Sequence, residues 1–108
     1  MKRQRASYSL GLDFGTNSVR ALLVELGSGR EAATAVHPYG SGREGILLDR
    51  ADPSLARQNP ADYLTGTVAC VRAALARARK SVKGFGPASI AGIGVDTTGS
   101  TPLPVDRR

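Results

Sequence analysis

The chain has 108 residues, of which 41% are hydrophobic and 22% are charged. This balance is typical of one small folded domain and excludes a disordered chain. No apolar run approaches the roughly 20 residues needed to cross a bilayer, and the basic start lacks the apolar core of a secretion signal. A single cysteine, Cys70, excludes an internal disulfide. We therefore expect a cytoplasmic protein without a membrane partner.

The formal net charge of +6 is concentrated at the two ends of the chain. Removing the five terminal basic residues leaves ten basic residues against nine acidic ones; the five are Lys2, Arg3, Arg5, Arg107 and Arg108. We interpret residues 1–7 as a basic tail and expect no nucleic-acid partner. A short nucleic-acid-binding protein is the alternative that charge alone favours. Steeply salt-dependent DNA binding that survives deletion of both ends would support it.

Three short strands are predicted at the start of the chain. Residues 8–14 alternate apolar and small side chains, residues 19–26 are apolar and partly β-branched, and residues 31–38 form a third run ending at a proline. The polar residues 15–17 and the sequence GSGR at 27–30 have the composition of tight turns. Three strands joined in this way predict an antiparallel meander.

Residues 40–59 predict a loop with a short strand at GILL, followed by the clearest helix of the chain. Asn59 is a capping residue, Pro60 suits the first helical position and Asp62 suits the positive N-terminal end. The sequence KGFGP at 83–87 ends the helix. Apolar residues at helical spacing predict its buried face, and basic residues its solvated face. The apolar set is Leu64, Val68, Val71 and Leu75, the basic set is Arg72, Arg77 and Arg79, and we expect packing roles for Tyr63 and Cys70.

The segment SIAGIGVDTT at 89–98 predicts a buried strand and completes the order β-β-β-α-β. A four-stranded sheet with a single helix leaves one face bare. We therefore expect an α/β fold that is incomplete.

The first turn has the chemistry of a phosphate site. A glycine allows close approach, backbone amides and short hydroxyls donate to phosphate oxygens, an aspartate at the strand end suits Mg²⁺, and an arginine offsets charge on a transferring phosphoryl group. Neither standard nucleotide-binding glycine motif occurs, and the spacing alone is more typical of an ordinary turn. The residues expected to face phosphate are Asp13, Gly15, Thr16, Asn17, Ser18 and Arg20.

Three segments together resemble a known family. GLDFGTNSVRALLVE at 11–25 resembles the phosphate hairpin of the superfamily that contains sugar kinases, heat-shock-70 proteins and actin. GIGVDTTGSTPLPVD at 92–106 and LARQNPADYL at 55–64 resemble segments of the FGGY carbohydrate kinases. The resemblance covers nearly the whole chain, in order and in register.

The resemblance implies a ribonuclease-H-like (actin-like ATPase) domain, of which residues 8–108 form the N-terminal part. It implies ATP-dependent phosphorylation of a ketopentose, with ATP and Mg²⁺ as cofactors, a small sugar as partner and a homodimeric full-length enzyme. The favoured sugar is L-ribulose of arabinose catabolism. Asp13 would lie near the metal, and the expected sugar-facing residues are Asp96, Thr98, Gly99 and Ser100.

Some expected parts have no counterpart in these 108 residues. The family's general base, second phosphate hairpin and adenosine pocket belong to later segments, so we expect the base beyond Arg108 and a truncated, inactive chain. Xylulose or ribitol kinases remain alternatives, as does an actin-like ATPase of chaperone or scaffold type, which would lack the sequence TTGSTP. For Asp96, the family comparison favours a hydrogen-bonded structural role near the site over a catalytic one.

Overall fold

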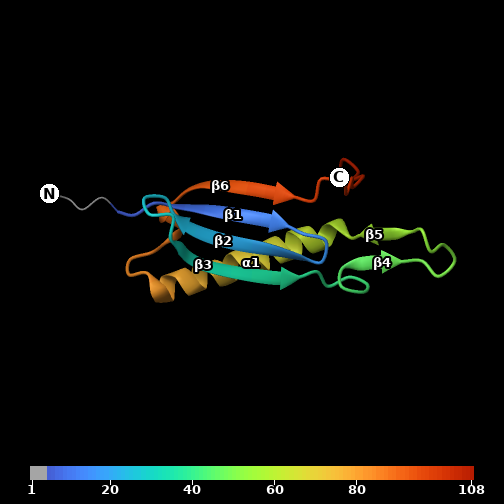
Figure 1. The fold of residues 1–108 in the computed structure, drawn as a ribbon, viewed down its shortest axis with the longest axis horizontal. Coiled ribbons are helices and arrows are strands. Elements are labelled where there is room, and N and C mark those ends of the chain that lie inside the picture. Colours follow the sequence, from blue (N-terminus) through green and yellow to red (C-terminus); the bar gives the residue numbers. More distant parts are fainter. Residues whose placement is uncertain (1–4) are drawn as a thin grey trace.

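A four-stranded sheet forms the centre of the computed structural model, which describes residues 5–108. The strands β1 (Tyr8–Phe14), β2 (Ser18–Glu25) and β3 (Glu31–Pro38) form an antiparallel meander, and β6 (Ile90–Thr97) pairs in parallel with β1. The strand order is β3-β2-β1-β6 (Figure 1). The predicted order of elements is confirmed. Residues 1–4 of the expected basic tail lie outside the described residues.

A small second sheet lies beyond one end of the first. It consists of β4 (Ile46–Leu48) and β5 (Ala56–Gln58), which pair antiparallel. Figure 1 shows this ribbon at the same end as the turn between β1 and β2 and the C-terminal residues. The strand within GILL is confirmed. Strand β5 was not predicted, because three residues carry no periodic pattern and this strand is defined by its partner.

Helix α1 (Pro60–Ser81) begins and ends where the sequence predicts. The Asn59 side chain accepts a hydrogen bond from the Ala61 amide at 3.0 Å, and Pro60 is the first helical residue. Asp62 accepts two hydrogen bonds from Ser41, which also ties the preceding loop to the helix start. After the helix, Gly84 has a φ of 78°, a conformation that glycine adopts without strain. A short 3₁₀ turn at Pro87–Ser89 then leads into β6.

The buried face of α1 differs from the predicted one. Leu64 and Val68 are 74% and 50% exposed, so their prediction as core residues is wrong, whereas Val71 and Leu75 are partly buried against the core. The face turned to the sheet consists of small residues, which are Gly66, Cys70, Ala74 and Ala78. Small residues allow the helix backbone to lie close to the sheet: a Cβ at Gly66 would lie only 2.6 Å from Cγ1 of Val19.

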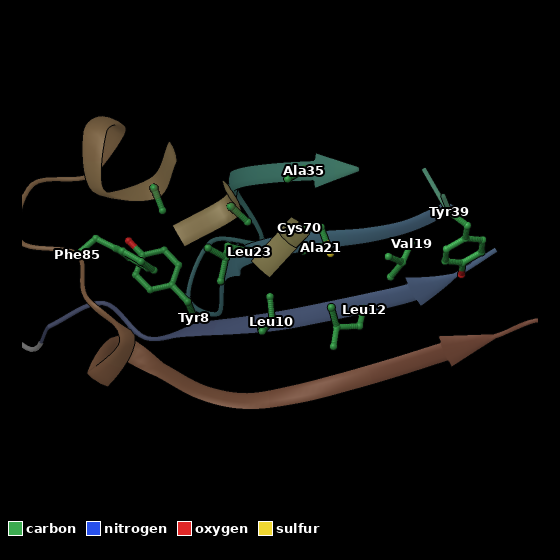
Figure 2. Close-up of a cluster of buried hydrophobic side chains, with 12 residues drawn as sticks. Tyr8, Leu10, Leu12, Val19, Ala21, Leu23, Ala35, Tyr39, Cys70 and Phe85 are labelled. Atoms are coloured by element: carbon green, nitrogen blue, oxygen red, sulfur yellow. The ribbon is translucent and has the colours of Figure 1, made fainter. Parts of the chain in front are cut away.

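The hydrophobic core lies between α1 and one face of the sheet (Figure 2). At one end, the rings of Tyr8 and Phe85 meet edge to face with centroids 5.1 Å apart. At the other end, Tyr39 lies beside Val19. The expected packing role of Cys70 is confirmed, since this side chain is 1% exposed and its burial raises the pKa of the thiol.

Strand β6 is exposed, contrary to the prediction of a buried strand. Ile93 and Val95 are 65% and 62% exposed, because α1 packs on β2 and β3 and leaves the β6 side of the sheet uncovered. The expectation of a partly bare sheet is therefore confirmed. Within residues 5–108, no helix combines the length and the apolar character needed to cross a membrane.

Candidate functional site

The turn between β1 and β2 is closed by its own backbone. The Gly15 amide donates to the Ser18 carbonyl at 2.8 Å, so this amide is used within the turn. A Cβ at Gly15 would lie 3.2 Å from the same oxygen, which is a tight contact. Ser18, the first residue of β2, is half-buried. A side chain at this position would therefore need a small shift of the turn.

The tip of this turn is held by its carbonyl groups, while its amides stay open. The Thr16 carbonyl accepts from Gln58 Nε2 at 2.6 Å, and the Asn17 carbonyl accepts from the Tyr39 amide at 2.9 Å. The Asn17 side chain donates to the Glu44 carbonyl at 2.7 Å. Among the described residues, the Thr16 and Asn17 amides donate to no protein acceptor. These two N–H groups are therefore not used by the described part of the protein.

Three charged side chains lie in one row across the sheet. Asp13 on β1 faces Arg20 on β2 and Asp96 on β6 in register, one strand spacing of about 4.8 Å from each. All three are exposed and line a shallow depression whose floor includes Gly11 and Gly94. Glycines leave this surface open to close approach.

The expected sugar-facing residues follow β6 and reach the end of β1. The Thr98 amide donates to the Phe14 carbonyl at 3.2 Å, and the Thr98 hydroxyl bonds to that of Thr101 at 3.0 Å. Gly99 and Ser100 are exposed, and nothing lies within 4 Å of a Cβ built at Gly99. The structure therefore brings this segment to the edge of the sheet that carries the 15–17 turn, since the carboxyl ends of parallel strands meet at one edge.

A pocket of about 280 Å³ lies at this junction. It is lined by Phe14, Tyr63, Thr97, Thr98 and Thr101. Its walls therefore combine hydroxyl groups with aromatic rings, a combination suited to a small polar molecule with apolar faces.

Asp13 and Asp96 place two exposed carboxylates on neighbouring strands in register. Within residues 5–108 no three acidic, histidine or cysteine side chains gather in one place. Mg²⁺ commonly binds through one or two carboxylates together with phosphate oxygens and water, so two carboxylates are sufficient. Asp96 is exposed on β6, and its role, structural or in the site, stays a prediction.

Two residues that support the turn, Gln58 and Tyr39, were not predicted from the sequence. Gln58 lies within LARQNPADYL, but its bond to Thr16 spans 42 positions and no local pattern reveals it. Tyr63 packs edge to face on Phe14 and Tyr39, with centroids 5.7 and 5.3 Å apart, which confirms its packing role. The Tyr39 hydroxyl is buried without a partner among the described residues, and burial raises its pKa to about 12.

Comparisons with known proteins agree with the resemblance. No protein-family model matches the chain. It is 40% identical over 97 residues to a ribulokinase of Vibrio parahaemolyticus and 39% identical over 103 residues to one of Geobacillus thermodenitrificans, matches that cover 90% and 92% of the chain. This chain is homologous to the N-terminal region of the ribulokinases. It spans 16% and 17% of the length of these two relatives.

The fold also matches FGGY sugar kinases of known structure. A xylulose kinase of Brucella ovis matches 84% of the chain with a TM-score of 0.64 at 25% identity, and 16% of that kinase is covered. A xylulose kinase of Rhodospirillum rubrum matches 87% of the chain with a TM-score of 0.53 at 28% identity, again with 16% covered. The predicted α/β fold, the N-terminal part of such a kinase, is confirmed. The roles of individual site residues stay predictions.

Proposed function

We propose that this chain supplies the first phosphate-binding turn and part of the sugar site of an ATP-dependent kinase that acts on L-ribulose. The observation that carries the proposal is the 15–17 turn, whose two open amides lie at the same sheet edge as Asp13 and the 97–101 segment. The homology to ribulokinases supports the choice of sugar. We extend the proposal to a cytoplasmic homodimer of the longer enzyme, which the family resemblance implies.

Some of these residues are proposed to bind the phosphates of ATP, and others to bind the sugar. The Thr16 and Asn17 amides donate to phosphate oxygens, and Arg20 offsets charge that develops during transfer. Asp13 and Asp96 would hold Mg²⁺, which neutralises phosphate charge when it is bound. Thr98 and Ser100 offer hydroxyls to the sugar, and Gly99 leaves room for five carbons. We assign no general base to the described residues.

A chimera tests the choice of sugar. The chain would replace the matched region of the Vibrio parahaemolyticus ribulokinase, and ADP release would be measured with L-ribulose, xylulose and ribitol. We expect the highest kcat/KM with L-ribulose. A higher value with xylulose or ribitol would favour those kinases, and ATP hydrolysis that no sugar stimulates would favour the actin-like alternative.

Gly99→Arg in the same chimera tests the proposed sugar-binding residues. The arginine fills the open space beside Gly99, so we expect the KM for the sugar to rise about tenfold or more, a loss of about 1.4 kcal/mol. The KM for ATP should stay within a factor of two. Lys80→Ala, at an exposed position late in α1, is the control and should change neither value. An unchanged sugar KM in a folded Gly99→Arg chimera would remove Gly99 from the sugar site.

A further inference from the structure

We propose that Gln58 is a positioning residue that orients the Asn17 amide toward the phosphate site. The inference rests on the proposed function for the identity of the ligand. The orientation itself is a property of the chain alone and can be measured without a ligand.

Both ends of the Gln58 side-chain amide are used. Its Nε2 donates to the Thr16 carbonyl at 2.6 Å, and its Oε1 accepts from the Tyr63 hydroxyl. A carbonyl oxygen can only accept, so the NH₂ end of the amide must face Thr16. The Tyr63 hydroxyl then donates to the remaining oxygen. The orientation of the Gln58 amide is therefore fixed by its two neighbours.

The Thr16 carbonyl and the Asn17 amide belong to the same peptide group. In a planar trans peptide the C=O and N–H bonds point in opposite directions. A bond that draws the Thr16 carbonyl toward Gln58 therefore turns the Asn17 N–H away from Gln58, toward the open side of the turn. If this peptide rotated, its carbonyl oxygen would face an anion and repel it.

The support for Gln58 comes from the core. Tyr63 is held by edge-to-face contacts with Phe14 and Tyr39. Gln58 is the last residue of β5, and Glu44, which accepts from the Asn17 side chain at 2.7 Å, lies just before β4. The β4–β5 ribbon thus braces the turn at two points, at the end of the molecule where Figure 1 shows both. A binding group that is oriented before the ligand arrives loses less entropy on binding.

Two substitutions weaken the support of the Thr16 carbonyl without adding charge. Gln58→Met keeps the length of the side chain but can neither donate to Thr16 nor accept from Tyr63, and Tyr63→Phe removes only the hydroxyl. Thr65→Ala, at an exposed position on α1, is the control. Each ¹⁵N-labelled 108-residue protein would be compared by amide chemical shifts and relaxation, and then titrated with magnesium pyrophosphate.

We expect Gln58→Met to shift or broaden the Thr16 and Asn17 amide signals while the signals of residues 26–30 stay fixed. Affinity for magnesium pyrophosphate should fall about tenfold, and about threefold in Tyr63→Phe. Loss of one hydrogen bond in Tyr63→Phe should lower the melting temperature by no more than about 8 °C. Global loss of shift dispersion in Gln58→Met would make Tyr63→Phe the deciding variant.

Unchanged Thr16 and Asn17 signals in folded Gln58→Met would overturn the inference, and so would altered signals with an unchanged affinity. The wild-type titration decides the proposed function separately. If wild-type protein binds no pyrophosphate, the proposed phosphate site is wrong, whereas altered amide signals in Gln58→Met would still support the role of Gln58 in orienting the turn.

Discussion

The turns at the two ends of β2 have similar compositions but draw their hydrogen bonds from different parts of the chain. At the far turn, the Glu25 amide donates to the Arg30 carbonyl and the Gly29 amide to the Glu25 carbonyl, both at 2.8 Å. The Ser28 hydroxyl donates to the Glu25 carboxylate at 2.9 Å and accepts from the Arg30 amide at 3.2 Å. These four bonds join residues 25–30 to one another.

At the 15–17 turn the supporting bonds come from distant segments. Gln58, Tyr39 and Glu44 hold its carbonyls and one side chain, while the amides of Thr16 and Asn17 remain open. Two turns of similar composition are therefore supported differently: distant segments hold the carbonyls of the 15–17 turn, whereas residues 25–30 bond to one another.

The largest expected effect comes from Gly45→Ala, beside Glu44, whose carbonyl accepts from the Asn17 side chain of the 15–17 turn. Gly45 has a φ of 85°, and a Cβ there would lie 2.7 Å from Cβ of Tyr39. Strain and overlap together should lower the free energy of unfolding by about 3 kcal/mol, measured by urea denaturation. Amide signals near Glu44 and Asn17 should move more than those of residues 26–30.

Gly40→Ala is the matched control, because nothing lies within 4 Å of a Cβ there. It should change the free energy of unfolding by no more than about 0.5 kcal/mol. Equal costs for the two alanines would contradict the packing described around Tyr39.

The second prediction is a pH dependence of the free energy of unfolding that comes from Tyr39, whose amide donates to the Asn17 carbonyl. The Tyr39 pKa is raised to about 12 by burial, against 10.0 when the side chain is free. The unfolded chain therefore loses this proton first, so the stabilisation is complete below pH 10 and is lost as the pH rises through about 12. Relative to Tyr39→Phe, the wild-type protein should lose about 1 kcal/mol of unfolding free energy between pH 9 and pH 11. Parallel pH dependence of the two proteins in urea denaturation would show that the hydroxyl is not buried.

The smallest effects separate stability from binding at the two turns. Ser28→Ala removes two hydrogen bonds and should lower the free energy of unfolding by about 1 kcal/mol. Its affinity for magnesium pyrophosphate should not change. Thr16→Ala removes a hydroxyl that has no protein partner among the described residues, so its stability should change by less than about 0.5 kcal/mol. Its affinity for magnesium pyrophosphate should nevertheless fall. A loss of affinity in Ser28→Ala together with a loss of stability in Thr16→Ala would contradict the roles given to the two turns.

The parts of the fold that depend on residues close together in the sequence could be predicted. The first three strands and both ends of α1 follow from alternation, turn residues and the Asn59-Pro60 cap. The buried face of α1 could not be predicted, because the large residues Leu64 and Val68 suggest a core, whereas the close approach to Val19 requires small ones. The exposure of β6 could not be predicted either, since it depends on where α1 lies across the sheet.

The candidate site shows the same division. Asp13 and Arg20 are brought together by the hairpin, which the sequence predicts, and the family resemblance indicates their chemistry. The orientation proposed for the Asn17 amide depends on Gln58, 42 positions from Thr16. Contacts of this separation leave no periodic trace in one sequence.

The central claim is that the 15–17 turn, with Asp13 beside it, binds phosphate. Its most direct test is a titration of the ¹⁵N-labelled chain with MgATP, with MgCl₂ alone as the reference. We predict saturable shifts of the Thr16 and Asn17 amides that Asp13→Asn weakens strongly, while the signals of residues 26–30 do not move. Equal shifts at both turns, shifts confined to the basic chain ends, or no shift at Thr16 and Asn17 would contradict the account.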